Sequence, residues 1–308
     1  MPGGRSVNQD FKTRRLRAVA EDVRSGATSL ACKALEDLID YTDAVKVEEV
    51  TELINELRDL ASQMQLARPA QAALQNALER WMEALASVSP LELPQARRKT
   101  AAMADRLIEE LRLAQSGTIE AAFSLISEGT RIMVLGMSAQ VLGVFNACHQ
   151  SGRKVEAIIC EARPGMEGRK MARALNKMAI SAQFISEAQI PALMSEADLV
   201  ITGACQVCHD GSVVAKVGSR LLALAAQDAA VPFWVLAESF KHSVCAPDAV
   251  EMEEMPVDEL YLDPLAGIQV RNIYTDLVPA RLVSRWVNEQ GAQTDFRSLS
   301  LEPQLPLL

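Results

Sequence analysis

Short apolar runs rich in β-type residues alternate with helical stretches between Gly129 and Ala237, and this alternation constrains the fold more than any other feature of the chain. The predicted strands cover residues 131–136, 155–160, 183–185, 199–203 and 232–237, and the predicted helices cover 139–150, 168–177 and 216–227. Such alternation favours a parallel sheet with helices on both faces, in which ligands bind at the carboxyl ends of the strands. We therefore predict an α/β chain with a Rossmann-like, doubly wound sheet.

The chain before Gly129 has helical periodicity almost throughout. Apolar residues recur there at spacings of three and four, as in Leu53, Leu57, Leu60 and Met64. A length of 308 residues suggests about two domains. We expect a helical N-terminal domain over residues 1–128 and a Rossmann-like domain over residues 129–308.

Local signals set the expected helix limits. Arg68-Pro69 ends one helix, and a proline-containing segment precedes a long helix over 95–115. Ser116-Gly117-Thr118 is predicted to begin a separate helix that runs to Ile126. Near the C-terminus an amphipathic helix is predicted over 280–288, followed by an irregular tail after Gly291, in which Pro303 and Pro306 argue against a last helix.

Charge and cysteine content limit the partners and the compartment. The formal net charge is −9, so nucleic-acid binding would need a strong local basic patch. The one basic cluster is interpreted as a solvated helix face, made of Arg5, Lys12, Arg14, Arg15 and Arg17. We expect a cytoplasmic protein with no direct nucleic-acid partner and no membrane contact, because an export signal and an apolar run of spanning length are both missing. The six cysteines fit reduced core thiols.

The segment Cys160 to Lys170, C-E-A-R-P-G-M-E-G-R-K, joins a predicted strand to a predicted helix. Arg163 and Arg169 offer planar forks of donors, and Gly165 and Gly168 let backbone approach a ligand. A helix N-terminus behind them favours an anion. The segment therefore predicts phosphate binding, and the alternative is a surface loop whose arginines pair with nearby carboxylates.

Five ordered motifs resemble the initiation factor 2B alpha/beta/delta subunit family, which includes methylthioribose-1-phosphate isomerase and ribose-1,5-bisphosphate isomerase. They are E-x-R-P-x-x-x-G-R-K-x-A, A-D-L-V-I-x-G-A, the loop N/D-G-x-x-x-x-K-x-G-[ST], V-P-F-x-V-x-A-E-S-F-K and D-x-x-P. In this chain they correspond to 161–172, 197–204, 210–219, 231–241 and 276–279. Arg68-Pro69 followed by Leu74-Gln-Asn-Ala-Leu is similar to a further family segment.

The resemblance implies a helical domain on a Rossmann-like domain, a homodimer formed through the latter, and a phosphorylated sugar or nucleotide as ligand, with no further cofactor. Four cations would hold the phosphate by charge-assisted hydrogen bonds, namely Arg68, Arg163, Arg169 and Lys216. The other candidate ligand-binding residues are Gly136, Ser138, Glu161, Gly168 and Lys241. Glu161 is expected to orient an arginine, and Lys241 either reaches the ligand or pairs with Glu238.

Three positions depart from the isomerases of the family. Gly136 is assigned to the position of their cysteine, Cys205 replaces the aspartate of their G-A-D motif, and Ala215 replaces an asparagine. Our leading hypothesis is therefore a regulatory, diverged non-catalytic protein that binds a sugar phosphate or nucleoside monophosphate. The alternative is an aldose-ketose sugar-phosphate isomerase in which Cys205 is the catalytic proton shuttle.

The run Cys205-Gln-Val-Cys208-His209 also fits the pattern of covalent haem attachment, and its thiols and imidazole are zinc-ligand types. Haem attachment occurs in exported proteins, and a second pair of zinc ligands is not visible, although His242 or Cys245 could approach. We predict no metal site. Cys208 is expected in the core and Cys205 at the ligand, with a redox dithiol as a minor alternative.

Overall fold

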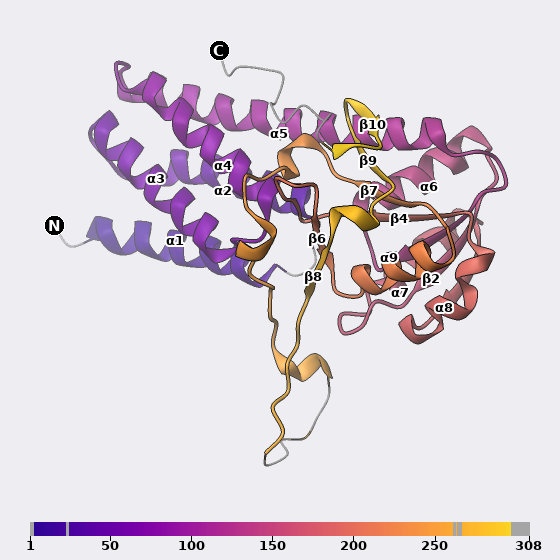
Figure 1. Cartoon of the computed structure of the whole chain (residues 1–308). Coiled ribbons are helices and arrows are strands. Elements are labelled where there is room, and N and C mark those ends of the chain that lie inside the picture. Colours follow the sequence, from indigo (N-terminus) through magenta and orange to yellow (C-terminus); the bar gives the residue numbers. More distant parts are fainter. Residues whose placement is uncertain (1–2, 23–24, 261–262, 264–266, 297–308) are drawn as a thin grey trace. The chain divides into compact units, whose positions relative to one another are not determined.

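A computed structural model describes residues 3–22, 25–260, 263 and 267–296. Figure 1 shows the helices and strands of the chain. They form two compact units, and the division falls after Leu113. This division lies before residue 128, where the sequence analysis placed the domain boundary, and the change from helices to strands follows at Arg131. None of the helices in the described ranges is long and apolar enough to cross a membrane.

The first unit is helical, as the periodicity predicts. Its helices are α1 (Gly3–Glu21), α2 (Ala27–Ala44), α3 (Val50–Ala67), α4 (Ala72–Ala84), the 3₁₀ turn η1 (Leu85–Val88) and the first part of α5 (Leu93–Leu125). The apolar residues of α3 that recur at spacings of three and four lie in the core, namely Leu53, Leu57, Leu60 and Met64. On α1 the Lys12 ammonium lies 2.6 Å from Glu56 and 2.7 Å from Asp59, so this basic residue is neutralised within the unit.

The long helix α5 corrects one prediction. Residues 93–125 form one continuous helix, whereas the sequence analysis expected a new helix to begin at Ser116-Gly117-Thr118. The Thr118 hydroxyl does not cap a helix start but donates to the carbonyl of Ala114, one turn earlier, at 2.9 Å. Gly117 is retained in the helix at a close contact, because a Cβ there would lie 2.9 Å from the Cβ of Glu289. A tertiary contact therefore explains this glycine, which helix propensity alone would place at a break in the helix.

The second unit contains a seven-stranded sheet in the order β10-β9-β7-β4-β1-β2-β3. Its strands are β1 (Arg131–Leu135), β2 (Glu156–Cys160), β3 (Ser181–Ile185), β4 (Leu199–Gly203), β7 (Phe233–Leu236), β9 (Arg285–Asn288) and β10 (Gly291–Gln293). All neighbouring pairs are parallel except β9 and β10. Counted along the chain, this is the doubly wound order, and it confirms the predicted fold class.

Two buried clusters cover the faces of this sheet. One packs the sheet against α8 (Ile190–Leu193) and α9 (Ser219–Asp228). The 3₁₀ turns η2 (Glu187–Gln189) and η3 (Met194–Glu196) flank α8. The other packs it against the end of α5, α6 (Ala139–Ser151) and α7 (Gly168–Lys177). Consecutive strand residues point to opposite faces, so Trp234 and Leu236 lie in the second cluster while Phe233 and Val235 lie in the first.

A second, three-stranded antiparallel sheet was not predicted. It consists of β5 (Gln206–Val207), β6 (Val213–Lys216) and β8 (Thr275–Val278). The segment around residues 205–218, expected to be a loop, therefore contains two of its strands. The predicted helix start at Lys216 is wrong for the same reason, because Lys216 ends β6 and α9 begins at Ser219. The connection from β7 to β8 contains the 3₁₀ turns η4 (Ser239–Lys241), η5 (Pro247–Ala249) and η6 (Val257–Leu260).

The predicted helix over 280–288 is also wrong. Ala280–Leu282 form the 3₁₀ turn η7, and Arg285–Asn288 form β9, which pairs with β7. Leu282, Val283, Trp286 and Val287 fit a helical spacing, but the same run also suits a strand, and short apolar runs do not distinguish the two. Residues 285–288 form a strand because they pair with the edge of β7, which would otherwise be unpaired. The expected irregular tail begins instead with β10, and Pro303 and Pro306 lie outside the described residues.

We expect Gly168→Ala to destabilise the second unit. A Cβ at Gly168 would lie 2.1 Å from the carbonyl oxygen of Cys160, which is backbone and cannot rotate away. The cost of overpacking at such a site is about 1–3 kcal/mol of unfolding free energy, measured by urea denaturation. Gly26→Ala is the control, since nothing lies within 4 Å of a Cβ there. Equal midpoints for the two variants would contradict the prediction.

Candidate functional site

The strand order reverses between β1 and β4, and the carboxyl ends of these strands bring together groups from distant segments. Gly136 follows β1 with φ of +71°, and Ser138 is the N-cap of α6. Gly203 ends β4, and a Cβ there would lie 2.5 Å from the Ser138 hydroxyl oxygen and 3.5 Å from Gln140 Oε1. Gly203 therefore lets the Ser138 hydroxyl and the Gln140 amide approach the end of β4, at the place where ligands of doubly wound sheets bind.

The next strand end, after β7, carries a buried polar network. Lys241 Nζ donates to Gln140 Oε1 at 2.9 Å and lies 3.1 Å from Glu238 Oε2, and the Gln140 amide donates to the same carboxylate. Glu238 is fully buried, and the other two side chains are nearly so. Of the two alternatives for Lys241, the structure shows the pair with Glu238. The ammonium is held by a carboxylate and an amide, which satisfies a charge that burial would otherwise make costly.

The loop after β2 positions the two arginines differently. Arg169 donates from Nε and Nη2 to Glu161 Oε1 at 2.8 and 2.6 Å, so Glu161 orients an arginine as expected. Arg163 is exposed, and its Nη1 lies 3.5 Å from the sulfur of Met166. Within the described residues it has no carboxylate partner. Arg163 is consequently the arginine of this loop that is available to an anion without breaking an existing pair.

Lys216 is brought to the same loop by the small sheet. Its ammonium lies 2.8 Å from Glu167 Oε1 and 3.5 Å from the ring centroid of Tyr274. The Tyr274 hydroxyl donates to Glu259 at 2.5 Å, and burial followed by this carboxylate raises the pKa of the phenol. A Cβ at Gly165 would lie 2.5 Å from Glu167 and 2.7 Å from the Tyr274 hydroxyl. The close approach of the 163–167 loop to Lys216 therefore depends on this glycine.

Arg68 belongs to the first unit, so its position relative to the other three cations stays a prediction. It follows α3, is buried, and donates from Nη1 to the carbonyl of Asp22 at 2.6 Å. Its own carbonyl accepts from the Gln75 amide at 3.1 Å. These bonds fix the break at Arg68-Pro69 between α3 and α4.

The structure confirms the expected core position of Cys208, whereas the expected position of Cys205 at the ligand stays a prediction. Cys208 is fully buried and Cys205 is partly exposed directly before β5. Burial raises the pKa of the Cys208 thiol to about 12, with Cys245 and Asp210 adding to the effect, and burial likewise raises the pKa of Cys160 to about 12. Thiols held protonated in this way are poor nucleophiles and poor metal ligands. The described residues contain no group of three or more His, Cys, Asp or Glu placed to hold a metal ion.

Sequence reasoning missed three residues of this region. Gln140 is hydrogen-bonded to both Glu238 and Lys241, Glu167 neutralises Lys216, and Tyr274 lies under the same ammonium. Glu167 lies inside the quoted motif between Arg163 and Arg169, and its charge was the available signal. The sequence contained no such signal for Gln140 and Tyr274, because their roles depend on contacts with residues about 100 and 58 positions away, respectively.

The fold is that of an α/β protein with a doubly wound sheet, and polar groups from β1, β4 and β7 gather at the switch point of that sheet. The chain belongs to the Initiation factor 2 subunit family, whose model matches residues 23–295. This confirms the resemblance drawn from the five motifs.

Curated relatives match over most of their length. A ribose 1,5-bisphosphate isomerase of Archaeoglobus fulgidus is 28% identical over 281 residues, which cover 89% of this chain and 88% of the relative. A putative translation initiation factor eIF-2B subunit 2-like protein of Pyrococcus abyssi is 31% identical over 278 residues, covering 88% and 92%. The family therefore includes both isomerases and proteins named as translation factors.

Solved structures share the fold. The translation initiation factor eIF-2B of Pyrococcus horikoshii OT3 superposes with a TM-score of 0.80 at 25% identity, covering 94% of this chain and 98% of the other. The 5-methylthioribose 1-phosphate isomerase of the same organism gives a TM-score of 0.78 at 18% identity, covering 91% and 83%. The second likeness shows a common fold alone.

His242 makes the stability of this region depend on pH. It follows Lys241 and packs edge-on against Phe296, and burial lowers its pKa to about 4, with Glu238 opposing the shift. A folded pKa below the unfolded value of about 6.5 means that the unfolded chain binds the proton first, so stability falls as the pH drops from 6.5 towards 4. We expect a loss on the order of 3 kcal/mol across this window.

Urea midpoints between pH 7 and pH 4 measure this loss. His242→Gln should flatten the dependence, and His149→Gln, on an exposed position of α6, should retain it. The same slope in His242→Gln as in the wild type would contradict the assignment.

Proposed function

We propose that this chain binds a phosphorylated pentose at the carboxyl edge of its large sheet and acts as an aldose-ketose sugar-phosphate isomerase. The observation that carries the proposal is the likeness to ribose 1,5-bisphosphate isomerase along nine-tenths of the chain. The polar groups at the ends of β1, β4 and β7 support it, because their neighbours are the motifs that match the family.

The phosphate would be held beside the loop between β2 and α7. Arg163 has an exposed guanidinium fork that suits phosphate oxygens, and the N-terminus of α7 begins five residues later. Lys216 would join it after exchanging Glu167 for the phosphate. Arg169 has the role of fixing Glu161, and the loop with it, since its Nε and Nη2 already donate to that carboxylate.

The anomeric oxygen of a pentose 1-phosphate carries the phosphate, so its isomerisation breaks the ring bond between C1 and O4 with a proton delivered to O4, moves the hydrogen of C2 to C1, and takes the proton of the C2 hydroxyl to leave the ketone. A group that takes and returns these protons is therefore needed. Cys205 lies two residues after β4 and is partly exposed, which makes it the thiol suited to this role. The buried Glu238–Lys241 pair would stabilise charge that develops on the sugar oxygens. Ser138, above Gly203, would orient the substrate through its hydroxyl.

A regulatory binding protein is the second candidate. The observation that favours it is the replacement of the family's cysteine, aspartate and asparagine by Gly136, Cys205 and Ala215. Relatives named as translation factor subunits have the same fold, and one fold hosts many functions. Such a protein would bind the sugar phosphate without converting it.

Turnover separates the two candidates. Ribose 1,5-bisphosphate and 5-methylthioribose 1-phosphate are incubated with the protein, and the ketose product is followed by ¹³C NMR. We expect conversion that falls by about 10²-fold or more in Cys205→Ala, because a lost proton-transfer group costs that much. Cys245→Ala, at another partly exposed cysteine, should retain the rate. Binding without turnover supports the regulatory candidate, and an unchanged rate in Cys205→Ala removes the role of the thiol.

Calorimetry tests the phosphate contact independently of turnover. Arg163→Gln should weaken binding by about 10- to 100-fold, since a hydrogen-bonded charge contributes about 1.5–3 kcal/mol. Glu167→Gln should tighten it, because Lys216 is then no longer neutralised in the free protein. Arg173→Gln, an exposed arginine on α7, is the matched control and should bind like the wild type. The binding proposal fails if the folded wild-type protein shows no heat of binding with either sugar phosphate.

A further inference from the structure

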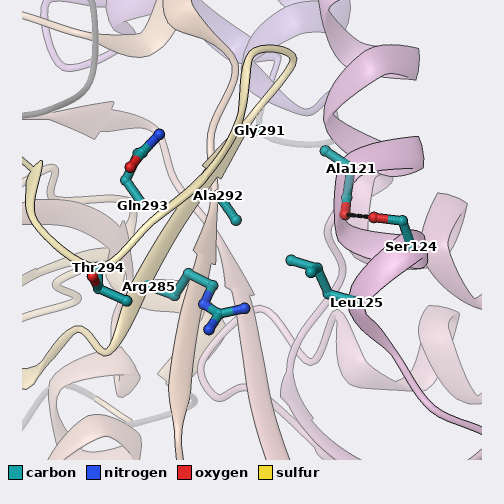
Figure 2. Close-up of a pocket in the computed structure, with 8 residues that line it drawn as sticks. All are labelled: Ala121, Ser124, Leu125, Arg285, Gly291, Ala292, Gln293 and Thr294. Atoms are coloured by element: carbon teal, nitrogen blue, oxygen red, sulfur yellow. Dashed lines mark hydrogen bonds between the residues drawn. The ribbon is translucent and has the colours of Figure 1, made fainter.

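We propose that a groove between the end of α5 and the β9–β10 hairpin is a second ligand site, which binds a small carboxylate with an apolar body. The groove has a volume of about 400 Å³ (Figure 2). This lies within the range of small-molecule pockets. Its walls come from the last turns of α5 on one side and from β9 and β10 on the other, and its lining residues are Ala121, Ser124, Leu125, Arg285, Gly291, Ala292, Gln293 and Thr294.

Arg285 is the charged residue of the lining, and the sheet register fixes where it lies. It begins β9 and pairs with Trp234 of β7, so both side chains stand on the face that α5 and α6 cover. The guanidinium carbon lies 5.0 Å from the Trp234 ring centroid, a cation–π contact that holds the side chain in place. In Figure 2 the guanidinium points towards the α5 side of the groove, where Leu125 lies.

The donors of Arg285 are not used elsewhere in the described part of the chain. No hydrogen bond or carboxylate contact of its guanidinium is found among these residues, and the lining contains no Asp or Glu. The nearby end of α5 does not need it, because Arg153 Nη1 already donates to the carbonyls of Phe123 and Ile126 at 2.6 and 2.7 Å. A held guanidinium with free donors in a groove without acids favours an anionic ligand.

The surroundings favour a carboxylate over a phosphate. One guanidinium fork matches the two oxygens of a carboxylate. The groove offers no second cation and no helix N-terminus, and it lies at the C-terminus of α5, whose partial negative charge opposes a compact dianion. Leu125 is 40% exposed, and with Ala121 and Ala292 it provides an apolar wall for the rest of the ligand.

This site differs from the one proposed for the sugar phosphate. Arg285 lies at the amino end of β9, which runs parallel to β7, so it is at the opposite edge of the sheet from Glu238. The groove also contains none of the residues assigned to the phosphate. The inference therefore does not rest on the proposed function, and either one stands if the other fails.

Ligand-observed NMR titrations of the full chain test the proposal, with benzoate as the probe, benzamide as its uncharged isostere and inorganic phosphate as a compact anion. We expect benzoate to bind wild type at least 10-fold more tightly than benzamide or phosphate does. Arg285→Gln should weaken benzoate at least 10-fold and Arg285→Lys by less, since it keeps the charge and loses the fork. Arg281→Gln, outside the groove, should bind like the wild type.

Removing Arg285 also removes its cation–π contact, which could disturb the fold, so a second variant tests the groove with Arg285 in place. Ala121→Leu fills the groove from α5 at a helix position that tolerates leucine, leaves Arg285 in place, and should also weaken benzoate. Equal affinities of benzoate and benzamide, equal affinities of benzoate and phosphate, or benzoate binding that neither Arg285→Gln nor Ala121→Leu changes would each overturn the proposal.

Discussion

The parallel pairing of β1 with β2 on one side and β4 on the other is the constraint on which the second unit depends. Parallel strands need long crossovers, and the chain here runs outwards from β1 to β2 and β3 before it crosses back to place β4 on the other side of β1. The loops after β1 and β4 therefore separate to either face, and Gly136, Ser138 and Gly203 are left at the opening between them. The same order places the end of β7, with Glu238, beside the end of β4.

Most of the basic side chains predicted to bind phosphate are already paired within the protein. Of the four cations predicted to hold phosphate, Arg169 and Lys216 each contact a carboxylate, and Arg68 donates to a carbonyl. Lys241 is likewise paired. In the absence of a ligand, a cation near a low-dielectric surface is stabilised by such a partner, and an anionic ligand must exchange with it. The unpaired state of Arg163 is therefore more informative than the number of cations in the motif.

Glycines allow several segments of the second unit to come into close contact. Gly168 allows the start of α7 to approach the carbonyl of Cys160, and Gly165 allows Glu167 and Tyr274 to meet next to Lys216. Gly117 has a comparable role on α5, at the Glu289 contact. The β-strand and helix pattern identifies where such loops occur, whereas the reason for each glycine is a contact with a segment far along the chain.

The sequence by itself determined the α/β class, the helical first unit, the strands of the large sheet up to β7 and the family, because hydrophobic periodicity and ordered motifs are local properties. Only the tertiary structure decided that residues 93–125 form one helix, that 285–288 form a strand, and that 206–207 and 213–216 join β8 in a second sheet. In each case the local signal was ambiguous, and hydrogen bonds to a distant strand or packing against a distant side chain selected one structure. The same holds for the site, since the motif names Arg163, Arg169 and Lys216, but Glu161 and Glu167 determine which of them is free.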